Sequence, residues 1–355
     1  MEQPPSPVSR PSGKREWLPM LLKIAIPAVV SVGLCVVMFR DIDFGAMMEI
    51  IRRDCRFGWI ALNLAIGLLP MFFRAMRWRL QLRVIGCRPP LRVLVYSMFG
   101  TYAVNLVFPR LGEVWRTGYI AGREGTPFPA VFGSMVADRL ADTCTVALLT
   151  LFTFIIASGP LTDFVREYPD AYRAISAVLA SPWTWGAVGA FILLAWLFMK
   201  RGNGGLSLKI KGFFRGLWEG FAAIARMDHK GAWLLYTAGV WGCYFLQLYV
   251  AFRAFPMTDG ILERYGAVAP LVCFVLTSIS MGVPSNGGIG PYQATMIFGL
   301  SVFAPAAALT AGPAREAFLT EAAAFGNLLI GAQTLFWVVC GLVVFGLIAI
   351  DKRRG

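Results

Sequence analysis

Three charged residues follow directly after a proline that stops an apolar run. They are Arg110, Glu113 and Arg116, and the run extends from Asn105 to Pro109. Their spacing of three places them at neighbouring positions on one side of a helix that begins at the proline. A helix start inside a membrane also points unpaired N–H groups and the positive end of the helix dipole into a cavity. This pattern predicts a phosphate-binding site. The alternative is that the charges only form ion pairs that hold the segment in place.

A second group of charges lies inside the long apolar run 128–157. It consists of Asp138, Arg139 and Asp142. Ionisable groups in a membrane helix are costly and are therefore candidates for function. The two carboxylates are one helical turn apart and repel each other unless a cation lies between them or one is protonated. We expect an ion-pairing partner, which the charged segment after Pro109 would supply; proton coupling is the second interpretation.

The second half of the chain contains a matching interruption. Gly287, Gly288 and Gly290 break an apolar run, and a further apolar run follows them. Paired interruptions in the two halves of a membrane protein indicate a transport site. Glycines permit positive φ and close backbone approach, so they would open a half-helix aimed at the middle of the membrane. Each glycine is equally well explained by tight packing or a sharp turn.

Two arginines, Arg74 and Arg77, stand beside Trp78 at the end of a predicted helix over residues 58–73. Long basic side chains at such an end extend toward the membrane surface and fix the orientation of the helix. We therefore expect a cytoplasmic basic rim here.

The composition indicates an all-α polytopic membrane protein. Of 355 residues 57% are hydrophobic and 15% charged, and the mean hydropathy is +0.64. The net charge of +13 would suggest nucleic acid as the partner of a soluble chain, but here the basic residues lie in short loops. Seven cysteines without a CxxC pattern and a single histidine leave little from which to build a metal site or a catalytic triad. No metal, cofactor or catalytic residue is expected.

Basic residues near both ends place the two termini in the cytoplasm. The apolar runs predict six full transmembrane helices, over residues 21–39, 58–73, 128–157, 183–199, 232–252 and 318–348. The segments 93–125 and 265–312 must each return to the side on which they began. Each is a re-entrant hairpin or a pair of crossings, and the charges in the first favour the hairpin. The total is eight helices if the two hairpins count as spans.

This topology predicts a single membrane domain over residues 17–350, with a disordered tail at 1–16 and a short tail at 351–355. Inverted repeats span residues 57–157 and 231–350. Between them, residues 182–230 hold a linking helix and an amphipathic helix with a helical apolar stripe. That second helix either lies in the membrane interface or packs on the protein itself.

The ordered motifs resemble the lysylphosphatidylglycerol synthase transmembrane-region family of flippase-like proteins. They are Arg74-x-x-Arg77-Trp78, Asn105-x-x-x-Pro109-Arg110-x-Gly112-Glu113-x-x-Arg116, Asp138-Arg139-x-x-Asp142 and Gly287-Gly288-Ile289-Gly290. The resemblance implies an inner-membrane protein that moves lipids or lipid-linked molecules. Asp138 stands where the family usually has Glu, and Gln293 where a Glu often follows the glycines. The soluble aminoacyltransferase domain of bifunctional members is absent from this sequence, so no synthesis of lysyl-lipid is expected.

The prediction is therefore a flippase-like transporter for an anionic phospholipid or lipid-linked molecule, with a polar cavity between the two hairpins. The expected substrate-binding residues are Asn105, Arg110, Glu113, Arg116, Asp138, Arg139, Asp142, Gly287, Gly288 and Gly290. Two alternatives stay open. One is an ion or small-solute transporter, and the other is a membrane-embedded lipid transferase that uses Glu113 or Asp138 as acid or base.

Overall fold

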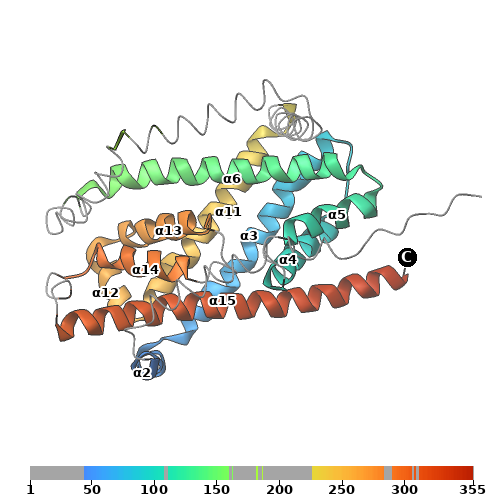
Figure 1. Cartoon of the computed structure of the whole chain (residues 1–355). Helices are drawn as coiled ribbons and strands as arrows, with labels where there is room; N and C mark the ends of the chain where they lie inside the picture. Colours follow the sequence, from blue (N-terminus) through green and yellow to red (C-terminus); the bar gives the residue numbers. More distant parts are fainter. Residues whose placement is uncertain are drawn as a thin grey trace, which may run out of the picture.

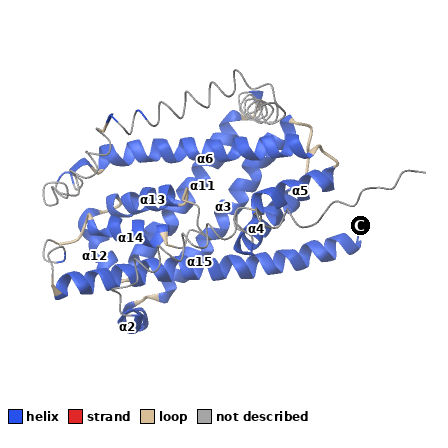
Figure 2. Cartoon of the chain, viewed as in Figure 1, coloured by secondary structure: helices blue, strands red, loops and turns tan. Residues whose placement is uncertain are grey.

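The structure is a computed structural model that describes residues 44–107, 111–159, 162, 181–182, 186, 226–283, 290–305, 308 and 312–354. Within these ranges the regular elements are all helices, as Figure 2 shows. In chain order they are α2 (Phe44–Asp54), α3 (Phe57–Val84), α4 (Leu91–Val107), α5 (Gly112–Glu124), α6 (Phe128–Ile156), α11 (Lys230–Ala251), the 3-10 turn η1 (Phe252–Ala254), α12 (Pro256–Tyr265), α13 (Val268–Ser280), α14 (Pro291–Ser301) and α15 (Pro313–Arg354). The all-helical prediction is confirmed for this part of the chain.

Four helical stretches are long and apolar enough to cross a membrane. They are α3, α6, the combined α11 and η1, and α15 as far as Ile350. The pair α12 and α13 would make a fifth crossing, although the two helices meet at a bend of 113°. The chain is thus a multi-pass membrane protein. The predicted helix 21–39, the amphipathic helix, the N-terminal tail and almost all of the predicted helix 183–199 lie outside the described residues.

The outward faces of α6 and α15 are apolar, as expected of helices in contact with lipid. Leu148 and Ile155 on α6, and Leu335 and Leu342 on α15, are strongly exposed. A soluble protein rarely leaves such continuous apolar faces in water. In Figure 1, α6 and α15 run along opposite sides of the molecule, with the other described helices mostly between them.

Helix α3 is longer than the sequence predicted. It does not end near residue 73 but continues to Val84, through the first arginines of the basic stretch. Arginine is a good helix former, and Ala75, Trp78 and Leu82 continue the buried face of the helix. Pro70 lies inside α3 without ending it. Arg74 and Arg77 are consequently inside a helix and buried, which differs from the expected basic rim.

Helices α3 and α11 pack closely against each other in the centre of the molecule (Figure 1). At one contact two buried amides exchange hydrogen bonds with the opposite backbone. Asn63 Nδ2 donates to the carbonyl oxygen of Gln247 at 2.7 Å, and Gln247 Nε2 donates to that of Asn63 at 3.0 Å. Further along, Phe73 lies against Gly239, where a Cβ atom would come within 3.0 Å of the Phe73 ring. The two helices therefore run antiparallel and in close contact.

Helices α4 and α5 occupy the first segment that was predicted to be a hairpin or a pair of crossings. The Gly112 N–H donates to Asn105 Oδ1 at 2.8 Å, so a side chain of the first arm caps the start of the second. A Cβ atom at Gly112 would collide with the carbonyl oxygen of Thr101. Helix α5 begins at Gly112, three residues later than the sequence predicted. Pro109 itself lies outside the described residues.

Helices α13 and α14 occupy the second such segment. Gly290, with φ of +91°, precedes α14, and its N–H donates to Gln293 Oε1 at 2.6 Å. Gln293 Nε2 in turn donates to Asn327 Oδ1 on α15 at 3.2 Å. Helix α12 precedes this hairpin and carries Asp259, which forms ion pairs of 2.8 Å with Arg56 and 2.7 Å with Arg253. Asp259 thereby ties the start of α3 to the end of α11.

Each hairpin also contacts the long helix of the other half. Helix α15 packs along α4, where Trp337 stacks on Tyr102 with ring centroids 5.0 Å apart. Helix α6 packs against α13 in the corresponding way. The first half of the molecule and the second half are therefore interleaved.

Candidate functional site

The candidate site is a buried cluster of charges where α3, α5 and α6 meet, which we call the ionic cluster. Its members are Arg74, Arg77, Glu113, Arg116, Asp138, Arg139 and Asp142. Arg77 lies at its centre: Nη2 is 2.8 Å from Asp138 Oδ1 and 2.8 Å from Asp142 Oδ1. The side chains of Arg77 and Asp138 are 0% exposed. The two carboxylates thus have an ion-pairing partner, as expected, but α3 supplies it and not the segment after Pro109.

The register between α3 and α6 brings these groups together. Arg74 Nη2 donates to Asp142 Oδ2 at 2.7 Å, and Trp78 Nε1 donates to Ser134 Oγ at 3.0 Å. The contacts therefore move toward the end of α3 as they move toward the start of α6, about one turn at a time, so the two helices run antiparallel here. Because both helices present the same helical spacing, two arginines and two aspartates pair without distorting either backbone.

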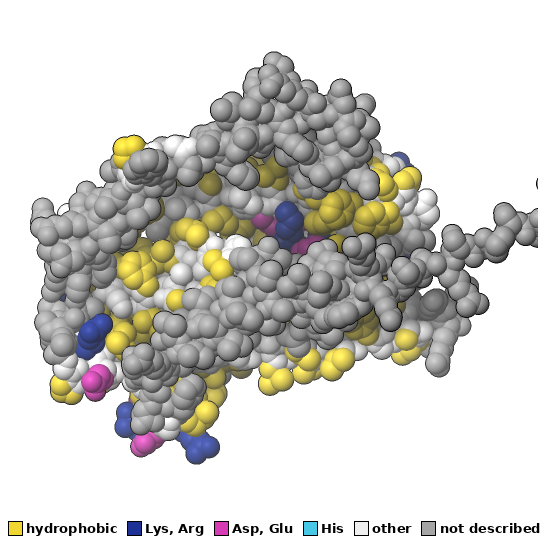
Figure 3. Space-filling model, in the orientation of Figure 1, with side chains coloured by type: hydrophobic (Ala, Val, Ile, Leu, Met, Phe, Trp, Pro, Cys, Tyr) yellow, Lys and Arg dark blue, Asp and Glu magenta, His cyan; other side chains and the backbone are white. Residues whose placement is uncertain are grey.

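Helix α5 extends the cluster with Glu113 and Arg116. Glu113 forms ion pairs of 2.8 Å with Arg116 on the same helix and 2.7 Å with Arg139 on α6. Arg139 also approaches Asp142 Oδ2 at 3.5 Å, so the charges form one connected network. In Figure 3, a basic side chain and acidic side chains lie side by side in a recess near the centre of the view, with hydrophobic side chains beside them.

Aromatic and sulfur groups surround the arginines. The Arg116 guanidinium lies 4.4 Å from the Trp78 ring centre, and its Nη1 donates to Met98 Sδ at 2.8 Å. On α11, Trp233 lies 6.0 Å from Arg77 and Tyr244 lies 5.8 Å from Arg74. Such rings attract cations while excluding water, which strengthens the electrostatic interactions inside the cluster.

The described charges of the cluster do not balance. Four guanidiniums face three carboxylates, so the cluster carries a net charge of +1 when all of its members are ionised. Among the described residues, no acceptor takes a hydrogen bond from Arg74 Nε, Arg77 Nε, Arg77 Nη1 or Arg116 Nε. Buried polar groups without partners are costly, and a positive excess with free donors is suited to receive an anion.

The structure brings together all seven of the charged residues that the sequence singled out on α3, α5 and α6. It also places Arg116 over the Trp78 ring, a contact that was not expected. Asn105 lies beside the cluster, and its amide oxygen is used by Gly112. Gly290 contacts Gln293 in the other half of the molecule. Arg110, Gly287 and Gly288 lie outside the described residues.

Sequence reasoning missed several residues of the site, namely Trp78 as a ring beneath Arg116, Met98, Ser134, Trp233 and Tyr244. It also assigned Arg74 and Arg77 to the membrane surface. One signal was present: the positions 74, 77 and 78 on α3 repeat at helical spacing, as do 134, 138 and 142 on α6. Complementary charges on two such faces indicate a pair of packed helices.

Comparison with known proteins identifies relatives of the chain. The model of a family described as "Lysylphosphatidylglycerol synthase TM region" matches residues 24–315. A Haloferax volcanii protein named glycosyltransferase AglD is 33% identical over 93 residues, covering 25% of this chain and 15% of that protein. A UPF0104 membrane protein of Methanothermobacter thermautotrophicus is 29% identical over 100 residues, covering 28% of each. The matches therefore span less than a third of either relative. No solved structure matches the chain.

Proposed function

We propose that this chain, which belongs to the lysylphosphatidylglycerol synthase transmembrane-region family, moves an anionic lipid or lipid-linked molecule across the cytoplasmic membrane. The observation that carries the proposal is the ionic cluster, in which buried guanidiniums outnumber the described carboxylates. Five of its seven members lie on α3 and α6, which are long enough to cross a membrane. It provides charge and hydrogen-bond donors at a depth where lipid provides neither.

The physical obstacle to lipid movement is the headgroup, because a charged phosphate loses its water in the hydrocarbon region. Guanidinium groups replace that water with up to five N–H donors each, in a geometry that fits phosphate oxygens. A phosphate that reaches the cluster finds donors on Arg74, Arg77 and Arg116 that no described acceptor uses. Its negative charge also offsets the excess positive charge of the cluster.

The exposure of the charged groups suggests an order of contact. Arg139 and Glu113 are 35% and 22% exposed, whereas Arg77 and Asp138 are closed to solvent. A headgroup would contact Arg139 first and replace its ion pair with Glu113. Glu113 would then keep Arg116 as its partner. In this scheme the arginines bind the headgroup, and the carboxylates hold the arginines in position between transport cycles.

We further propose that the two hairpins are re-entrant and form the walls of the polar cavity. With about 1.5 Å of rise per residue, α4 is roughly 26 Å long, α5 and α13 are each roughly 20 Å long, and α14 is shorter still. These lengths fall below the roughly 30 Å of a bilayer core. Asn105 and Arg110 would belong to one wall, and Gly287, Gly288 and Gly290 to the other.

The interleaved packing supports the proposal of inverted repeats over residues 57–157 and 231–350. Helix α4 contacts α15 as α13 contacts α6, and α3 crosses α11 between them. A twofold relation that exchanges α3 with α11 exchanges these contacts as well. The single membrane domain over residues 17–350 and the cytoplasmic placement of both termini complete the proposed arrangement.

The test is an assay of transbilayer movement in liposomes that contain the purified protein. Fluorescent phosphatidylglycerol is compared with fluorescent phosphatidylcholine, which has no net charge. We expect wild type to move phosphatidylglycerol faster and Arg139→Gln to reduce that preference by about tenfold, because one charged contact is lost. Arg139→Lys keeps the charge and should retain part of the preference.

Arg253→Gln is the matched control. Arg253 has the same side-chain exposure as Arg139, 35%, and the same 2.7 Å ion pair to a carboxylate, but it lies at the far end of α11. It should leave lipid movement unchanged. Equal movement of both lipids by wild type, or equal effects of the two glutamine variants, would contradict the proposal. Lack of any lipid movement would favour an ion or small-solute transporter or a lipid transferase.

A further inference from the structure

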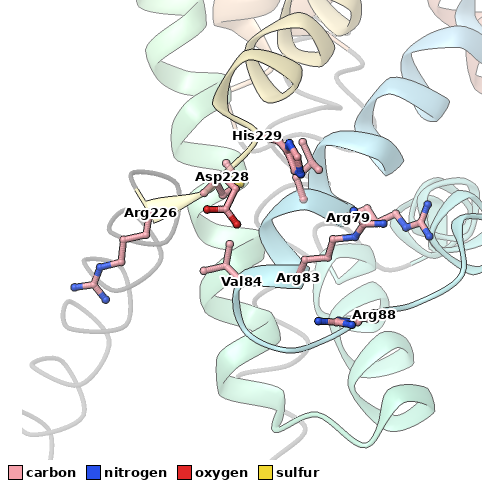
Figure 4. Close-up of a pocket in the computed structure, with 9 residues that line it drawn as sticks. Arg79, Arg83, Val84, Arg88, Arg226, Asp228 and His229 are labelled. Atoms are coloured by element: carbon pink, nitrogen blue, oxygen red, sulfur yellow. The ribbon is translucent and has the colours of Figure 1, made fainter.

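A cavity of about 610 Å³ lies where the last turns of α3 meet the start of α11 (Figure 4). Four of its lining residues are arginines: Arg79, Arg83, Arg88 and Arg226. They come from α3, from the loop before α4 and from the segment before α11, so chain folding brings them together from two distant parts of the sequence. Asp228 is the sole carboxylate among the lining residues.

The arrangement of these side chains is visible in Figure 4. Arg79, Arg83 and Arg88 lie on the α3 side of the cavity, Asp228 and His229 come from the α11 side, and Arg226 extends away from the others. Three guanidiniums therefore border the cavity opposite one carboxylate. Even without Arg226, the lining carries an excess of positive charge when its arginines and Asp228 are ionised.

Like charges that gather around a hollow repel one another unless an anion lies between them. Within the described part of the chain, none of Arg79, Arg83 and Arg88 forms an ion pair. Guanidinium groups are well suited to phosphate, because their planar fork donates two parallel hydrogen bonds. We propose that this cavity is a binding site for phosphate-bearing anions with at least two negative charges, such as a diphosphate group.

This basic cavity is separate from the ionic cluster. Arg79 follows Arg77 by two residues, and consecutive residues of a helix are about 100° apart, so the two side chains leave α3 in directions about 200° apart. The two sites share no lining residue. The inference therefore does not rest on lipid movement, and a protein that moves no lipid would still bind a diphosphate here.

The experiment is isothermal titration of the full chain, purified in a nonionic detergent, with inorganic pyrophosphate. We expect binding that weakens as salt is raised, because exposed charges are screened. The double variant Arg83→Gln with Arg88→Gln should bind about tenfold more weakly. Asp228→Asn should bind about threefold more tightly, since it removes the opposing charge. Loss of folding cannot produce that gain.

Arg52→Gln on α2 is the matched control, because Arg52 is exposed, lacks an ion pair within the described residues and precedes α3 at its other end. Its binding should equal that of wild type. Competition by mixed detergent micelles containing phosphatidic acid, compared with micelles containing phosphatidylcholine, identifies a lipid headgroup as the source of the phosphate. Pyrophosphate binding without such competition identifies a soluble ligand. Absence of pyrophosphate binding, or unchanged binding by the double variant, overturns the proposal.

Discussion

Replacing Arg77 by methionine removes the cation that lies between Asp138 and Asp142. Asp142 keeps Arg74 and Arg139 as partners, at 2.7 and 3.5 Å. Asp138 has Arg77 as its ion-pairing partner among the described residues, so it would be left as an uncompensated charge with 0% exposure. We therefore expect a large loss of stability from a substitution that keeps the volume and helix propensity of the site similar.

The expected loss in the free energy of unfolding follows from the cost of removing one partner of a buried ion pair, which is about 3–5 kcal/mol. For 355 residues, an unfolding entropy of about 2.1 cal/mol/K per residue totals roughly 0.75 kcal/mol/K. A loss of about 4 kcal/mol then lowers the melting temperature by about 5 °C. Asp138→Asn in the same chain removes the uncompensated charge, so the double variant should recover at least half of this shift.

The measurement is the temperature at which half of the detergent-purified protein still elutes as a single species in size exclusion. Arg79→Met is the control, because it makes the same change two residues along α3 at a side chain without an ion pair to any described residue. If Arg77→Met lowers the melting temperature no more than Arg79→Met, the cluster does not stabilise the fold. A double variant that loses the sum of the two single losses would refute the proposed pairing of Arg77 with Asp138.

Three further experiments test the fold. Gly112→Ala should cost about 1–3 kcal/mol because its Cβ collides with the backbone of α4, whereas Gly118→Ala, with its nearest atom 4.0 Å away, should be tolerated; thermal melting of both decides. Asn63→Leu and Gln247→Leu should each cost about 1–3 kcal/mol, and a double-mutant cycle should give a coupling of at least about 0.5 kcal/mol if their hydrogen bonds are reciprocal. Asp259→Asn should cost about 1 kcal/mol in low salt and less in 1 M NaCl, since its partners are partly exposed; equal losses at both salt concentrations would contradict this.

The sequence was sufficient for the fold class, because apolar runs of membrane length predict helices and the ordered motifs indicate the family. It also predicted that Asp138 and Asp142 need a cation, since two carboxylates one turn apart repel each other. The identity of that cation could not be predicted. Arg77 is 61 residues earlier in the chain, and pairing over that separation depends on how α3 and α6 pack, which periodicity within a single helix does not report.

The end of α3 shows the same limit. A dense run of arginines after an apolar segment usually marks the membrane surface, so the prediction ended the helix near residue 73. The structure instead buries Arg74 and Arg77, because carboxylates of α6 offset the cost of removing their charges from water. The hydrogen bond between Asn105 and Gly112 was not foreseen either, since an amide that caps a neighbouring helix is indistinguishable in sequence from an amide that binds a ligand.

The pairing of α3 with α6 also imposes an order on the synthesis of the protein. Asp142 is made 68 residues after Arg74, which takes roughly 3–14 s at about 5–20 residues per second. During that interval both arginines have emerged without their carboxylates, and the second half of α3 is too costly to bury in lipid. We expect it to stay at the membrane surface until α6 arrives. Completion of the membrane insertion of α3 would then depend on the translation of a later helix.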